Sequence, residues 1–147
     1  MMTEYKGYIF HYHNKFKKEF KKIFKNNKCP SIKNDFKLLY DILIQDLKEY
    51  NEFKPNRCNR MAGLTNNVSL PAFIIKKFRC NKIKKGANSG FRITFLFDKD
   101  ESRFIFVEIF NKNKKSIPDK SRIGELFKNG NNISDELYDG EEKILND

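Results

Sequence analysis

Aromatic and β-branched residues open the chain in the stretch GYIFHYH at residues 7–13, and this pattern predicts a short strand. A helix is expected to follow directly from Asn14, which is a favourable N-cap. Four apolar residues then recur at helical spacing, namely Phe16, Phe20, Ile23 and Phe24. Lysines fill most of the positions between them. One face of this helix should therefore be apolar and the other strongly basic.

A second helix is predicted to begin near Asn34 or Asp35 and to run to Tyr50. Its apolar stripe consists of Phe36, Leu39, Leu43, Leu47 and Tyr50. Leu38 and Ile42 widen this stripe, so the helix is expected to cover a sheet. Residues 51–70 have no clear period and are interpreted as a long connection, a kind of segment that is often functional.

Three β-rich runs follow Pro71, at residues 73–85, 90–97 and 103–110. The last two are joined by the polar sequence DKDES, which predicts a hairpin and hence an antiparallel sheet. Residues 121–127 are expected to form a short closing helix. The predicted fold is α+β, with an N-terminal strand and two helices packed on an antiparallel sheet of about four strands. Residues 1–123 would form one domain and residues 124–147 a weakly ordered tail.

Charge divides the chain into a basic body and an acidic end. The 147 residues include 30 Lys plus Arg and 19 Asp plus Glu, for a net charge of +11. Residues 124–147 hold seven acids and two lysines, so the tail carries −5 and the rest +16. A basic body of this kind suits a polyanionic partner, either nucleic acid or a very acidic protein. A genomic bias towards Lys and Asn is the alternative explanation.

The cysteines and histidines predict no metal centre and no cofactor. Cys29, Cys58 and Cys80 are odd in number and widely spaced, which indicates neither a disulfide framework nor a zinc site and favours a reducing cytoplasm. His11 and His13 share a face of the first strand and are interpreted as a surface pair. The N-terminus has no pattern of a signal peptide, and no window is long and apolar enough for a membrane span, so no membrane partner is expected.

Basic residues are concentrated between residues 76 and 92. On a strand, alternate side chains share a face. One face would present Lys76, Lys82 and Lys84, and the other Lys77, Arg79 and Lys85. Such a surface would bind phosphates without reading bases. The alternative is an edge strand whose lysines prevent aggregation.

Arg92 differs from these lysines because it stands among Phe91, Ile93 and Phe95 in SGFRITFLF, residues 89–97. A guanidinium on a rigid strand can hold a phosphate or stabilise charge that develops during phosphoryl transfer. A structural salt bridge to Glu108 on the next strand is the competing hypothesis.

The order of elements and the sequence of residues 72–115 resemble the RelE/ParE superfamily of toxins from toxin–antitoxin modules. The shared features are a basic strand, the Ser89-Gly90-Phe91-Arg92 turn, a hairpin of apolar strands and a closing basic cluster at Lys112, Lys114 and Lys115. The resemblance implies an endoribonuclease that cleaves mRNA at the ribosome, in which the substrate's 2′-hydroxyl attacks the adjacent phosphate. A cognate acidic antitoxin would be the inhibitor.

By the same resemblance, four residues occupy catalytic positions: Arg92, Lys84, Lys85 and Lys112. Six others would bind RNA: Lys76, Lys77, Arg79, Lys82, Lys114 and Lys115. Nucleases of the family often carry Tyr or His after the last strand, and NKNKKSIPDKSRI contains neither, so the general acid is unassigned. Two other functions are compatible with the pattern. One is a non-catalytic module that binds nucleic acid or protein, and the other is a ParE-like gyrase inhibitor.

Overall fold

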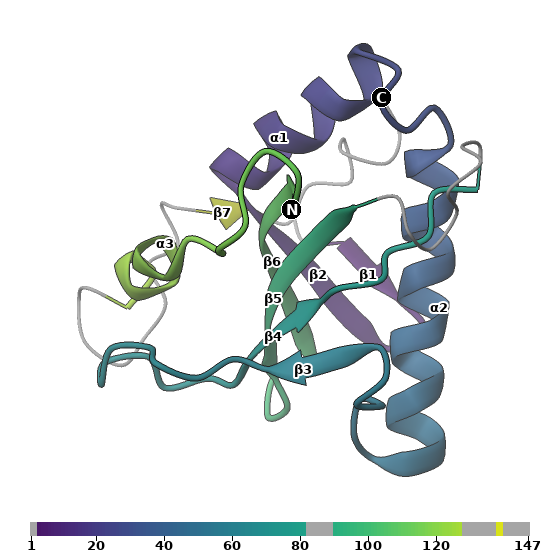
Figure 1. The fold of residues 1–147 in the computed structure, drawn as a ribbon. Helices are drawn as coiled ribbons and strands as arrows, with labels where there is room; N and C mark the ends of the chain where they lie inside the picture. Colours follow the sequence, from purple (N-terminus) through teal and green to yellow (C-terminus); the bar gives the residue numbers. More distant parts are fainter. Residues whose placement is uncertain (1–2, 82–89, 128–137, 140–147) are drawn as a thin grey trace.

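The computed structural model describes residues 3–81, 90–127 and 138–139 (Figure 1). Its helices are α1 (Asn14–Lys25), α2 (Ile32–Tyr50) and α3 (Lys120–Glu125). Its strands are β1 (Thr3–Tyr5), β2 (Tyr8–His13), β3 (Cys58–Arg60), β4 (Ala72–Ile75), β5 (Phe91–Asp98), β6 (Arg103–Asn111) and β7 (Tyr138–Asp139). The α+β class is confirmed. No helix in the described part of the chain is long and apolar enough to cross a membrane.

One sheet contains all of these strands, in the order β1-β2-β6-β5-β4-β3, with β7 paired to β2. The β5–β6 hairpin and the β4–β5 pair are antiparallel, as expected. However, β2 lies parallel to β6, with Ile9 opposite Arg103 and Tyr12 opposite Phe106. The sheet is therefore mixed and larger than the antiparallel sheet of about four strands that the sequence predicted. The two helices between β2 and the later strands give the long connection that parallel pairing requires.

Helices α1 and α2 cover one face of the sheet, which we call the aromatic face. Their buried residues include Phe16, Phe20 and Phe36, and they belong to the same core as Phe10 of β2 and Phe106 of β6. The ring centroids of Phe36 and Phe106 are 5.1 Å apart in an edge-to-face arrangement. Packed aromatic rings of this kind account for the high Phe content of an otherwise polar chain.

The opposite face of the sheet, which we call the α3 face, has a core of its own. Leu96, Ile105 and Val107 of the sheet are buried there together with Ile123 of α3 and Phe127 just after it. Leu64, Val68 and Leu70 pack against the same core, so much of the connection predicted at residues 51–70 forms part of this layer. In Figure 1, α3 lies to the left of the sheet and α2 to its right.

Three details of the predicted elements are wrong. The basic strand expected over residues 73–85 ends at Ile75, and residues 76–81 have no regular structure. Helix α2 begins at Ile32, earlier than predicted, and Leu38 and Ile42 point away from the sheet with 52% and 39% of their surface exposed. The closing helix is confirmed as α3. Most of the acidic tail lies outside the described residues, although Tyr138 and Asp139 pair with β2.

Candidate nucleic-acid interface

Arg92 lies on β5 opposite Phe110 of β6 and points to the α3 face. The guanidinium is half-buried, and its Nε is buried without a hydrogen-bond acceptor among the described residues. Thr94, the next residue of β5 on this face, is buried as well. The strand therefore holds a cation rigidly at the end of the sheet.

Glu108 is not the partner of Arg92. Its buried carboxylate accepts one hydrogen bond from Lys115 Nζ at 2.5 Å and another from the backbone N–H of Asp119 at 2.7 Å. Both carboxylate oxygens are thus occupied by the segment that follows β6. The competing hypothesis of an Arg92–Glu108 salt bridge is wrong for the arrangement described here.

The other predicted catalytic residues are only partly placed. Lys112 is exposed, and its backbone N–H donates to Gly90 O at 2.8 Å, so it lies just beyond the Arg92–Phe110 pair at the same end of the sheet. Lys84 and Lys85 lie outside the described residues, as does Lys82. The structure therefore brings Arg92 and Lys112 to one end of the sheet.

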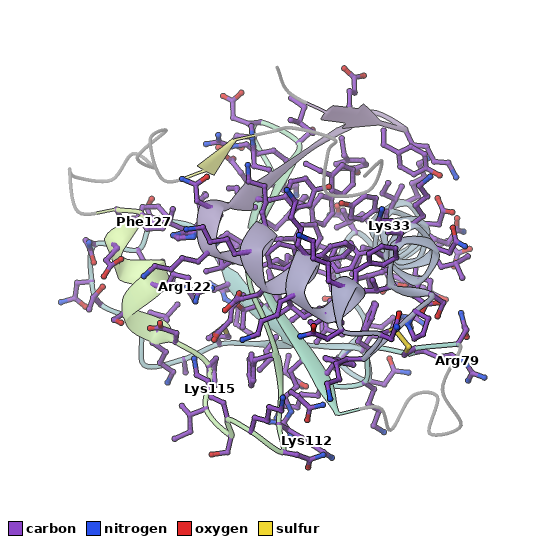
Figure 2. All side chains as sticks on the ribbon, turned by 90° about the horizontal axis from the view of Figure 1, so that it is seen from above. Lys33, Arg79, Lys112, Lys115, Arg122 and Phe127 are labelled. Atoms are coloured by element: carbon purple, nitrogen blue, oxygen red, sulfur yellow. A yellow bond between two sulfur atoms is a disulfide. The ribbon has the colours of Figure 1, made fainter. Side chains whose placement is uncertain are left out.

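The predicted RNA-binding residues are divided between two regions. Lys76, Lys77 and Arg79 are exposed on the irregular segment after β4, so they do not alternate between two faces of a strand. Figure 2 shows Arg79 well separated from Lys112 and Lys115. The expectation of one continuous basic strand surface is wrong, because the chain leaves the sheet after Ile75.

A cleft of about 540 Å³ lies between α1 and the ends of β5 and β6. Its apolar wall is formed by Ile23, Phe91, Ile109 and Phe110, and its polar wall by Glu19, Asn26, Asn111 and Asn113. Four lysines also line it, namely Lys22, Lys28, Lys114 and Lys115. Lys114 and Lys115 were predicted to bind RNA, whereas sequence reasoning missed Lys22 and Lys28. The strongly basic face of α1 was the signal that could have found Lys22.

The charges in this cleft, which we call the basic cleft, leave an excess of cations. Glu19 is held by Arg122, whose Nη1 and Nη2 lie 2.8 and 3.0 Å from its two oxygens. Lys115 is paired with Glu108. Lys22, Lys28 and Lys114 form no ion pair with any residue in the described ranges. An anion that enters the cleft would therefore meet lysines without meeting an unpaired carboxylate.

Asn111 builds the turn that carries two of these lysines. Its side-chain carbonyl accepts from Asn113 N at 2.9 Å, and its backbone carbonyl accepts from the N–H groups of Lys114 and Lys115, each at 3.0 Å. Gly90 has a φ of +90°, and a Cβ there would lie 3.0 Å from Asn111 Oδ1. Glycine is thus needed at position 90 both for its backbone conformation and for the close approach of Asn111.

His11 and His13 are buried, so their interpretation as a surface pair is wrong. His13 ends β2 and caps α1, since its Nδ1 accepts from Lys15 N at 3.0 Å. Burial, reinforced by the positive charges of Arg122 and Lys15, lowers the pKa of His13 to about 4. This histidine is therefore neutral at physiological pH, and its role is to cap α1 rather than to transfer protons.

The cysteines also differ from the prediction. Cys29 and Cys80 form a disulfide between the turn before α2 and the segment after β4. A disulfide is typical of oxidising surroundings, so it does not support the expected reducing cytoplasm. Cys58 is buried alone, and burial raises the pKa of its thiol to about 12.

Comparison of this chain with family models, with curated proteins and with solved structures found no match.

Proposed function

We propose that this protein binds RNA and that the basic cleft holds one strand of it. The observation that carries the proposal is a set of three lysines, Lys22, Lys28 and Lys114, that have no ion-pair partner among the described residues and surround a cleft whose lining acid, Glu19, is already paired with Arg122. Lysines neutralise backbone phosphates and release their counterions. The basic cleft therefore offers the sequence-independent part of an RNA-binding site.

The apolar wall favours a single strand over a duplex. Phosphates alone would be satisfied by surface lysines and would gain nothing from the apolar part of the lining, which consists of the half-buried Ile23 and the edges of Phe91 and Phe110 that reach the cleft. An unpaired base has an apolar face that packs against such side chains and polar edges that hydrogen-bond to amides such as Asn26 and Asn113. A base in a duplex is stacked and cannot enter the cleft. The combination of cations, amides and apolar surface thus matches a single-stranded nucleotide.

Fluorescence anisotropy with a labelled RNA tests this proposal. We expect single-stranded RNA to bind more tightly than a duplex of the same length. Replacing Lys22, Lys28 and Lys114 together by Ala should lower the affinity by roughly 30-fold or more, because three phosphate contacts are lost. The matched control replaces three exposed lysines outside the cleft, Lys37, Lys48 and Lys99. Equal losses in the two variants would mean that only the net charge matters, and the cleft would not be the site.

A second candidate function is the endoribonuclease toxin implied by the resemblance to RelE/ParE proteins. Arg92 favours it, because a half-buried guanidinium on a central strand, close to Lys112, is positioned in advance to meet phosphate. The order of strand, two helices and further strands is also consistent with that resemblance. In this function the 2′-hydroxyl of the RNA attacks the adjacent phosphate, and Arg92 stabilises the additional negative charge. An acidic antitoxin and the ribosome would be its partners in the cytoplasm.

Primer extension on mRNA after induced expression separates the two functions. The wild-type chain should produce new 5′ ends if it is a nuclease, and Arg92→Ala should abolish them while RNA binding persists. Arg92→Lys keeps the charge and is the matched variant, and it should restore little cleavage because the rigid fork of donors is lost. If the wild-type chain binds RNA but produces no new 5′ ends, the nuclease function is excluded and the non-catalytic binding function is supported. Inhibition of purified gyrase without RNA cleavage would instead support the ParE-like alternative.

A further inference from the structure

The disulfide between Cys29 and Cys80 lies beside a buried carboxylate. Cys29, Cys80 and Asp35 are all buried, and one ligand atom from each lies within 4.8 Å of the others. Asp35 belongs to the first turn of α2, and Ser31 lies just before that helix. A hydroxyl, a carboxylate and two sulfur atoms thus meet in one place, three of them from residues 29–35 and the fourth from Cys80.

The distances around this group resemble the edges of a tetrahedral metal site. Cys29 Sγ lies 3.6 Å from Asp35 Oδ2, and Ser31 Oγ lies 3.7 Å from Cys80 Sγ. Zinc bonds of the usual length to sulfur and oxygen place those atoms about 3.6 Å apart in a tetrahedron. Two edges therefore already match such a site. Ser31 Oγ and Asp35 Oδ2, now 2.6 Å apart, would have to separate by about 0.7 Å, and the two sulfur atoms, now bonded at 2.02 Å, by about 1.7 Å after reduction.

Asp35 is also oriented by neighbouring groups, as metal-binding carboxylates commonly are. Asn81 donates to Asp35 through its backbone N–H at 3.1 Å and through its side-chain amide at 2.5 Å. Because Asn81 follows Cys80 directly, these bonds also fix the position of that cysteine. Asn81 therefore helps to hold both the Asp35 carboxylate and the Cys80 sulfur in position.

We propose that the reduced form of this group is a zinc site, with Cys29, Cys80 and Asp35 as ligands and Ser31 or a water in the fourth position. A reductant converts the disulfide into two thiols: a dithiol gives two electrons and two protons and becomes a disulfide itself, whereas a phosphine gives two electrons, takes up the oxygen of a water molecule and leaves the protons of that water on the sulfur atoms. Zn²⁺ then binds the two thiolates and the carboxylate, and the two thiol protons are released to solvent. Three anionic ligands around a divalent ion leave a net charge of −1, and each cysteine is preceded in the sequence by a cation, Lys28 or Arg79.

This proposal is independent of RNA binding and concerns how the chain is cross-linked. The disulfide joins the start of α2 to the segment after β4 in oxidising surroundings. Zinc would make the same connection where cysteines are reduced, as in a cytoplasm. The two chemical states would thus preserve one fold in both environments.

Metal titration of the reduced chain tests the site. The protein is reduced with a phosphine without oxygen and titrated with Zn²⁺ against a competing chelator, and with Co²⁺ as a spectroscopic probe. We expect one ion per chain and the thiolate-to-cobalt charge-transfer and tetrahedral ligand-field bands. The Cys29→Ser/Cys80→Ser variant should bind more weakly by a factor on the order of 100 or more. Cys58→Ser is the matched control and should bind as the wild type does.

X-ray absorption of the zinc-loaded wild type gives a second measurement that does not depend on any variant folding. Two sulfur neighbours at about 2.3 Å and two lighter neighbours are expected. Asp35→Asn should reduce the affinity roughly 10-fold or more while leaving both sulfur neighbours in place. Fewer than two sulfur neighbours, or equal zinc affinity in the wild type and the double cysteine variant, would overturn the proposal.

Discussion

Lys115, in the turn after β6, forms an ion pair with Glu108, and its ammonium nitrogen lies 2.5 Å from the carboxylate Oε2. Glu108 is 1% exposed at its side chain, whereas Lys115 is 42% exposed. One residue of the pair thus lies inside the α3 face, and the other lines the basic cleft. This pair explains how a sheet rich in Phe and Ile accommodates an acid in its last strand.

Lys115→Met should destabilise the protein. The change leaves one oxygen of a buried carboxylate without its partner, which costs roughly 1–3 kcal/mol in the free energy of unfolding. Urea denaturation followed by circular dichroism measures this loss. Adding Glu108→Gln to Lys115→Met should recover part of it, because the buried charge is removed. A Lys115→Met protein as stable as the wild type would show that the pair does not contribute.

The salt dependence of RNA binding should identify which lysines contact phosphate. Each contact to single-stranded RNA contributes about 0.7 to the slope of log K against log salt concentration. Lys114→Ala alone should therefore reduce the slope by about that amount, and so should Lys22→Ala. Lys99→Ala, on the hairpin remote from the basic cleft, should leave the slope unchanged. Anisotropy titrations at four or five salt concentrations give the slopes.

His13 should make stability fall in mild acid. Its pKa is about 4 in the folded protein and 6.5 without the effect of burial, so between these values the unfolded chain binds a proton that the folded chain does not. The contribution is fully present above pH 6.5 and is lost as the pH falls towards 4, by up to roughly 3 kcal/mol.

His13→Asn tests this dependence because asparagine also caps helices well but does not titrate. The difference in unfolding free energy between wild type and variant should change from pH 7 to pH 4, in the direction that favours the variant at low pH. Urea titrations at each pH measure it. A difference that is constant with pH would contradict the assignment of this titration to His13.

Arg122 should not tolerate replacement by lysine. It donates to both oxygens of Glu19 and to Val107 O at 2.8 Å, so one buried guanidinium connects α3, α1 and β6. Lysine has one nitrogen and cannot make this set of bonds. We expect Arg122→Lys to lower the free energy of unfolding by roughly 2–4 kcal/mol.

The pair of Arg57 and Asp46 provides the matched comparison for Arg122→Lys. Arg57 also makes two hydrogen bonds to one carboxylate, but its side chain is 42% exposed. Arg57→Lys should therefore cost less than Arg122→Lys. Losses of the same size would mean that burial of Arg122 adds nothing to its role.

The local pattern of apolar and polar residues was sufficient to predict much of the fold. The spacing of Phe16 and Phe20 predicted α1, and the run after Gly90 together with DKDES predicted the β5–β6 hairpin. These features depend on neighbours a few residues apart, which the sequence displays directly. The same holds for the alternation that places Arg92 on the face opposite Ile93.

Contacts between distant residues could not be predicted in this way. The parallel pairing of β2 with β6, the Cys29–Cys80 disulfide and the meeting of Lys22 with Lys114 all join parts of the chain that are remote in sequence. Hydrophobic periodicity contains no information about which remote partner is chosen. The burial of His13 was missed for the same reason, and so were the partners of Glu108, which are Lys115 and the backbone of Asp119.

The parallel pairing of β2 with β6 also determines when the protein can fold during synthesis. Tyr8–His13 emerges from the ribosome early, but its central neighbour, Arg103–Asn111, is made nearly a hundred residues later. At typical rates of translation the first strand waits for several seconds or more without that partner. Contacts of such high sequence separation also slow folding itself. The nascent chain therefore cannot bury Phe10 and Tyr12 against Phe106 until almost the whole domain has been made.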